Sequence, residues 1–215
     1  MQFILVVPRQ QIFPRLSPQG FLPKEAVDLD LLREQVFFAE REFMEQCSHF
    51  KQLIPYITLT LGDEILCYQR QSKHSEQRLG GLWTVGFGGH VEPLDRNTPQ
   101  ARELGLLEAA ALRELHEETG LDVQFEMLHH AGLINSEQTD VSTVHLGLYY
   151  TADLGALNME REQILERVRE QAEPFKVLWR SRDALRAREE SVPPAPEGGE
   201  WEDWSRIALG ALGAL

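Results

Sequence analysis

The chain contains the stretch Arg113-Glu114-Leu115-His116-Glu117-Glu118-Thr119-Gly120-Leu121, around which the rest is organised. Its three glutamates are spaced so that they share one face of a helix. Like charges this close raise their own pKa values unless a positive charge lies among them. Carboxylate oxygens suit hard divalent ions such as Mg²⁺ and Mn²⁺, so the stretch predicts a metal-binding helix face. Gly120 is typical of the position just past a helix C-terminus.

The same residues resemble the closing half of the Nudix box, Arg-Glu-aliphatic-x-Glu-Glu-x-Gly-aliphatic, at every fixed position. The opening half does not match at the usual spacing, because its glycine and its glutamate would fall at Pro99 and Gly105. A glycine pair, Gly88-Gly89, occurs further upstream, and this indicates an insertion over residues 93–104. Glu92 and Asp95 are both candidates for the place of the missing first glutamate.

The resemblance implies an α/β fold, a Nudix-type α/β/α sandwich around a mixed β-sheet. It also implies a phosphohydrolase that uses Mg²⁺ or Mn²⁺ to cleave a phosphoanhydride bond in a nucleoside diphosphate linked to another moiety. The metal ligands implied are the Gly89 carbonyl, Glu114, Glu117 and Glu118. Glu114 or Glu117 would accept the proton of the attacking water. We expect Arg113, four residues before Glu117, to pair with a carboxylate and hold it in place.

Several residues outside the motif are candidates for further roles, and each also has an ordinary structural explanation. Glu137 is an alternative base, although an acidic loop residue is usually just solvated. Arg70 could bind a substrate phosphate or lie on the surface. Trp83 could stack on a ring or belong to the core, and His145 could bind substrate or be a structural histidine. Tyr149 shares a strand face with His145.

Two other functions fit parts of the pattern. A Nudix-fold regulatory protein would bind a nucleotide without cleaving it, and the absence of phosphate or nucleoside monophosphate release would reveal this. An isopentenyl diphosphate isomerase also has a Nudix-like fold but needs a cysteine, for which Cys67 is the candidate. Replacing Cys67 by alanine would test that alternative.

Composition limits the remaining possibilities. The 215-residue chain is 42% hydrophobic and 26% charged, as expected for a globular domain with additions. A formal net charge of −13 argues against nucleic acid or an anionic membrane as partner. The chain has two cysteines, and no secretory signal or membrane span is recognisable, so we expect a cytoplasmic protein that acts on a small molecule.

Hydrophobic periodicity predicts the organisation of the rest of the chain. Residues 1–53 should form an extension of a strand and a helix over residues 30–46, which covers a sheet or makes a homodimer contact. Residues 54–188 should form the Nudix domain, and residues 189–215 a linker and a C-terminal helix that docks back. We expect strands at 2–7, 54–61, 64–70, 83–87, 123–134, 143–151 and 175–179, and helices at 106–119, 160–170, 182–188 and 201–212.

Overall fold

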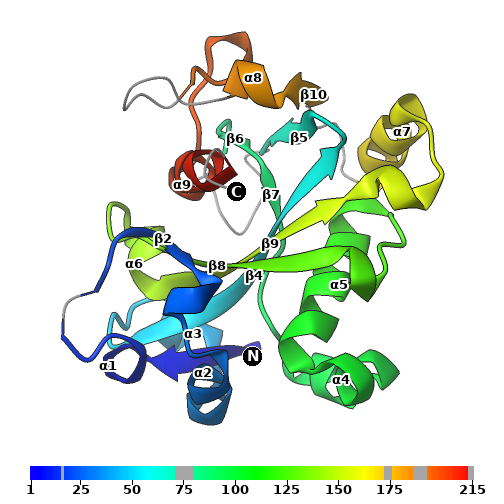
Figure 1. Ribbon diagram of the computed structural model, residues 1–215. Coiled ribbons are helices and arrows are strands. Elements are labelled where there is room, and N and C mark those ends of the chain that lie inside the picture. The colour runs from blue at the N-terminus through cyan, green and yellow to red at the C-terminus, as the bar shows by residue number, and fades with distance from the viewer. Residues whose placement is uncertain (16, 71–79, 172–175, 186–192, 213–215) are drawn as a thin grey trace.

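A mixed β-sheet forms the middle layer of the protein (Figure 1). The computed structural model describes residues 1–15, 17–70, 80–171, 176–185 and 193–212. Within them the strand order is β10-β5-β4-β9-β8-β2, and β4 and β9 pair in parallel while their other neighbours are antiparallel. Helices α5 and α7 pack on one face and α9 on the other. The predicted α/β/α sandwich around a mixed sheet is therefore confirmed.

The strands are β1 (Phe3–Pro8), β2 (Gly20–Pro23), β3 (Phe37–Glu40), β4 (Phe50–Leu61), β5 (Glu64–Gln69), β6 (Trp83–Thr84), β7 (Gly86–Phe87), β8 (Leu128–Asn135), β9 (His145–Asp153) and β10 (Val177–Ser181). The α-helices are α1 (Arg9–Ile12), α2 (Leu29–Gln35), α3 (Arg41–Met44), α4 (Pro99–Leu104), α5 (Leu106–Thr119), α6 (Asp140–Val144), α7 (Arg161–Gln171), α8 (Arg182–Leu185) and α9 (Asp203–Leu212). No helix among the described residues is long and apolar enough to cross a membrane.

Two hydrophobic clusters, one on each face of the sheet, follow from the two-residue period of the strands. In β9, Leu146 and Leu148 belong to the cluster under α5 and α7, and Tyr149 belongs to the cluster under α9. β4 alternates in the same way and is buried along nearly its whole length, as expected for a central strand. The predicted alternation of β9 is confirmed.

The prediction of a single helix over residues 30–46 is wrong. The helix α2 ends at Gln35, and β3 follows it and pairs antiparallel with β1. The run Val36-Phe37-Phe38 is β-branched and aromatic, and the edge of β1 offers it backbone partners, so tertiary pairing overrides the helical spacing. On its other side β1 pairs with β4, which begins at Phe50 and so crosses the expected boundary between residues 53 and 54.

The insertion between the glycine pair and the acidic helix folds into a 3₁₀ turn over Pro93–Asn97 and the helix α4. The Thr98 side chain accepts a hydrogen bond from the Ala101 N–H, and Pro99 is the first helical residue. Gly105 separates α4 from α5 with a φ of +108°, a conformation that favours glycine. The insertion thus leads directly into the N-terminus of α5.

The C-terminal segment returns to the sheet, as expected. Trp201 forms an isolated β-bridge with Trp83, and α9 then contacts β2, β6 and β8. Part of the predicted linker, 189–192, and the end of the helix predicted at 182–188 lie outside the described residues. The strand expected at 143–151 begins later, at His145, because α6 occupies Asp140–Val144.

Candidate active site

The glycine pair and the acidic face of α5 fit together closely. The Gly88 N–H donates a hydrogen bond of 2.7 Å to Glu118 Oε2. A Cβ atom on Gly89 would lie 2.6 Å from Glu114 Oε2, and one on Gly88 would lie 1.9 Å from the Pro55 carbonyl oxygen. Neither position has space for a side chain. Glycine at both positions therefore brings the backbone of this loop directly against two of the three glutamates.

The three glutamates differ in environment. Glu117 is exposed, whereas Glu114 and Glu118 lie against the glycine loop. Burial raises the pKa of Glu118 to about 7, against the opposing effects of Arg70 and the Gly88 N–H. Burial also raises the pKa of Glu114, although Arg113 opposes the shift. Two adjacent carboxylates that ionise reluctantly are stabilised by a cation, so this donor set fits a hard divalent ion.

Arg113 organises the carboxylates around it. It donates to both oxygens of the buried Asp95, at 2.6 and 3.0 Å, and to Glu114 at 2.8 Å and Glu117 at 3.0 Å. A further bond of 2.9 Å reaches the His90 carbonyl. Although burial opposes it, hydrogen bonding to Asp95 raises the pKa of Arg113. The arginine therefore links the inserted segment, the glycine loop and the acidic helix.

Glu92 and Asp95, the two candidates for the missing first glutamate, differ in their contacts. Asp95 is the carboxylate beside Arg113, and its Oδ2 also accepts from the Glu92 N–H at 2.8 Å. The Glu92 side chain instead accepts from the Gln2 amide at 2.6 Å, at the surface. Asp95, and not Glu92, is thus the carboxylate that pairs with Arg113.

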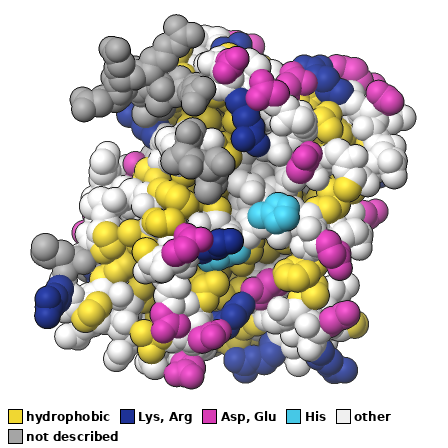
Figure 2. Space-filling view, in the orientation of Figure 1, with side chains coloured by type: hydrophobic (Ala, Val, Ile, Leu, Met, Phe, Trp, Pro, Cys, Tyr) yellow, Lys and Arg dark blue, Asp and Glu magenta, His cyan; other side chains and the backbone are white. Residues whose placement is uncertain are grey.

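A cavity of about 310 Å³ adjoins Gly88 and Gly89. Its lining comes from the middle of β4, from the residue after β5, from the start of α6, from the start of β9 and from the start of α9. Arg70 and His145, both predicted from sequence, contribute to it. Figure 2 shows histidine side chains near the middle of the corresponding view of the molecule, between acidic and basic ones. The cavity volume of about 310 Å³ is at the lower end of the range for small-molecule sites.

Three predicted site residues lie elsewhere. Trp83 and Tyr149 are fully buried in the cluster under α9, so neither ring is accessible to a ligand. Burial also raises the pKa of Tyr149 to about 12. Glu137 pairs with Arg9 and lines a different cavity, and this hydrogen bond lowers the pKa of Glu137. The structure brings none of these three together with the glutamates of α5.

Sequence reasoning missed residues that the C-terminal segment brings to the cavity. Glu202 accepts hydrogen bonds from Arg70 Nε at 3.0 Å and from the Tyr56 hydroxyl at 2.7 Å. Trp204 lines the cavity, and its ring nitrogen has no hydrogen-bond partner among the described residues. The available signal was the run Trp201-Glu202-Asp203-Trp204, in which acidic residues are enclosed by aromatic ones.

His90, immediately after the glycine pair, was also missed. Burial, reinforced by Arg41 and His145, lowers the pKa of His90 to about 2, so the ring is neutral. Its Nε2 lies 2.8 Å from Gln52 Oε1. Its position beside Gly89 was the only sequence signal that pointed to it.

Comparison with known proteins agrees with this geometry. The family described as NUDIX domain matches residues 55–197. Protein YmaB of Bacillus subtilis (strain 168) is 31% identical over 154 residues, which are 68% of this chain and 73% of YmaB. The chain therefore belongs to the Nudix family. The crystal structure of Tm1382, named as a candidate Nudix hydrolase, aligns over 99% of both chains with 28% identity and a TM-score of 0.66. The N- and C-terminal segments are thus part of the shared architecture.

Proposed function

We propose that the protein hydrolyses a phosphoanhydride bond in a nucleoside diphosphate linked to another moiety, with Mg²⁺ or Mn²⁺ as cofactor. The observation that carries this proposal is the fit between the glycine loop and the acidic helix. Gly88 donates to Glu118, and Gly89 approaches Glu114 where no side chain could be accommodated. A merely solvated acidic face would not be held against a loop in this way.

The residues that would hold the cation are Glu114, Glu117, Glu118 and the Gly89 carbonyl. A bound cation neutralises phosphate oxygens and lowers the pKa of water, which is the chemistry that cleavage of a phosphoanhydride requires. The half-buried Glu114 and Glu118 provide the charge that attracts the ion, and burial raises the pKa of both. The leaving group is a phosphate, so no strong general acid is required.

Proton transfer is assigned to Glu114 or Glu117. Arg113 donates to an oxygen of each, through the same terminal nitrogen, and so positions both carboxylates. Glu117 is the more exposed of the two and has a shorter route for passing a proton to solvent. Glu137 is less suitable, because its pairing with Arg9 lowers its pKa and makes it a weaker base.

The cavity beside the glycine pair would hold the rest of the substrate. Arg70 lies at its edge and would bring positive charge close to the phosphates. The rings of Trp204 and His145 meet edge to face, with centroids 6.4 Å apart, and line the same space. A planar group such as a nucleobase could contact these rings.

The isomerase alternative is disfavoured by the position of its cysteine. Cys67 is fully buried on the α9 side of the sheet and donates weakly to the Ile65 carbonyl. Burial raises the pKa of its thiol to about 12, so it stays protonated and out of reach of a substrate.

The test is hydrolysis of a panel of nucleoside triphosphates, sugar nucleotides, dinucleoside polyphosphates and coenzymes, followed as release of phosphate or nucleoside monophosphate. Glu117→Gln and Glu118→Gln should each lower metal-dependent turnover by about 100-fold or more, because each removes a charge from the acidic face. Glu103→Gln, on the exposed side of α4, is the matched control. Unchanged turnover in both α5 variants would refute the assignment. Tight nucleotide binding without any product would favour a regulatory protein.

A further inference from the structure

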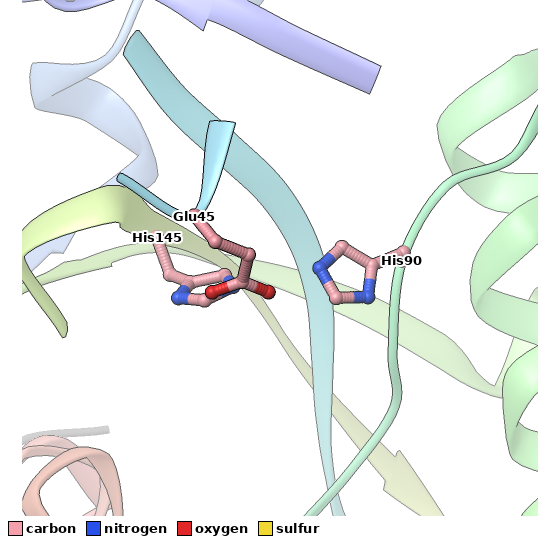
Figure 3. Close-up of side chains that lie close together, drawn as sticks. All are labelled: Glu45, His90 and His145. Carbon is pink, nitrogen blue, oxygen red and sulfur yellow. The ribbon is translucent and has the colours of Figure 1, made fainter. Parts of the chain in front are cut away.

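Three potential metal ligands meet outside the acidic face of α5. Glu45 at the end of α3, His90 after the glycine pair and His145 at the start of β9 each offer a ligand atom. These atoms all lie within 4.8 Å of one another. Figure 3 shows the Glu45 carboxylate between the two imidazole rings, whose centroids are 5.5 Å apart. Both histidines are buried, so the cluster is part of the folded structure and not a chance surface grouping.

Each of the three side chains has a hydrogen-bond partner in the surrounding structure. His145 Nδ1 lies 2.6 Å from the Val141 carbonyl, and His90 Nε2 lies 2.8 Å from Gln52 Oε1. Both partners are oxygen acceptors, so each ring is held in place by a hydrogen bond. Gln52 is also the register partner of His145 in the β4–β9 pairing, so one strand position orders both rings.

The carboxylate is oriented in the same way. Arg41 Nε donates to Glu45 Oε1 at 3.1 Å. Metal-ligating histidines characteristically donate their second ring nitrogen to a carbonyl or carboxylate, and metal-ligating carboxylates are themselves hydrogen-bonded. All three members of the cluster are hydrogen-bonded to the surrounding structure.

Two imidazoles and one carboxylate form a different donor set from the oxygens of the α5 site. Nitrogen donors favour borderline ions over Mg²⁺, and a His₂Glu set is one of the recognised ligand sets for Zn²⁺ with an open fourth position. With bonds of about 2.0–2.2 Å, the ligand atoms of such an ion lie about 3.3 Å apart, so small side-chain rotations would complete the site. His90 and His145 also line the cavity, which gives an ion and a water molecule access.

We propose that Glu45, His90 and His145 bind one Zn²⁺ ion, at a site separate from the one on α5. The ion would join the N-terminal segment, through α3, to the glycine loop and to β9. The proposal does not depend on the hydrolytic activity, because none of its ligands belongs to the acidic face of α5.

The experiment is calorimetric titration of the chelator-treated, full-length protein with ZnCl₂ in excess Mg²⁺, which occupies oxygen-only sites. We expect one equivalent of Zn²⁺ to bind. Glu45→Gln and His145→Gln should each weaken it by about tenfold or more, since each removes a ligand. Glu42→Gln on the exposed side of α3 and His129→Gln at an exposed position of β8 are the matched controls. Co²⁺ in place of Zn²⁺ should give the intense visible absorption of a four-coordinate site, and Glu45→Gln should diminish it.

Glu117→Gln separates this proposal from the hydrolase assignment, because it should lower turnover and leave Zn²⁺ binding in excess Mg²⁺ unchanged. If His145→Gln does not fold, Glu45→Gln still decides the question, since Glu45 lies at the end of a short helix outside both hydrophobic clusters. Absence of Zn²⁺ binding in excess Mg²⁺ would overturn the proposal. It would also be overturned if the Glu45 variant bound Zn²⁺ as tightly as the Glu42 control.

Discussion

Replacing Asp95 by asparagine should lower the free energy of unfolding by about 3 kcal/mol. Asp95 is 1% exposed and its two carboxylate oxygens accept from Arg113 at 2.6 and 3.0 Å. An amide keeps the shape but turns an N–H group toward the guanidinium and leaves part of its charge uncompensated. Removing one partner of a buried ion pair costs about 3–5 kcal/mol. The lower end applies, because Arg113 is 19% exposed and keeps its bonds to Glu114 and the His90 carbonyl.

Urea denaturation in the presence of a chelator measures this quantity without a contribution from bound metal. The control is Glu92→Gln, the same chemical change three residues away. Because the Glu92 side chain bonds to Gln2 at the surface, its loss should cost about 0.5 kcal/mol or less. In thermal unfolding, the Asp95 variant should melt about 6–12 °C lower than the wild type.

The two variants also test which carboxylate replaces the first glutamate of the Nudix box. The Asp95 variant should lose metal-dependent turnover as well as stability, since Arg113 then positions Glu114 and Glu117 less well. The reasoning is refuted if both variants have the same denaturation midpoint, or if Glu92→Gln is the more damaging change.

Three further predictions concern the same region. Gly89→Ala should abolish metal-dependent turnover in kinetic assays, because its Cβ would lie 2.6 Å from Glu114 Oε2. The control Gly210→Ala, with open space around it in α9, should stabilise the protein by about 0.5–1 kcal/mol in urea denaturation. In the metal-free protein the pKa of Glu118, about 7, is higher than its ordinary value of 4.5, so ionisation of Glu118 destabilises the folded state. The free energy of unfolding should therefore fall as pH rises from about 4.5 to about 7. In thermal melts recorded across this pH range, Glu118→Gln should remove the contribution of Glu118 to that slope. Trp204→Ala should raise KM more than it lowers kcat in steady-state assays, because Trp204 lines the cavity. The control Phe43→Ala, at an exposed position, should change neither constant. Equal effects of the two variants would exclude Trp204 from substrate binding.

The acidic helix was predictable because its information is local. Residues three and four apart share a helix face whatever surrounds them, and Gly120 ends the helix with a φ of +66° and an N–H bonded to the His116 carbonyl. The boundaries of α5 agree with the prediction for this reason. The alternation in β9 was equally predictable, since it depends only on the two-residue period of a strand.

The N-terminal prediction failed where a local pattern competed with a distant partner. Residues 36–40 fall within the helical spacing predicted over residues 30–46, but β1 offers them a strand edge, and that pairing is not visible in the local sequence. Trp83 and Tyr149 show the same limit for site residues. Whether an aromatic ring lies in a cavity or under a helix depends on which face of the sheet α9 covers.

The sequence by itself determined the acidic helix face and the family, and through the family the sandwich fold, because motif spacing is a property of neighbouring residues. Only the tertiary structure decided that Asp95 and not Glu92 meets Arg113, that Glu202 and Trp204 border the cavity, and that Glu45 joins two histidines. Each of these contacts joins segments far apart in the chain. Their proximity depends on how strands pair and on where the terminal segments pack, which no local pattern encodes.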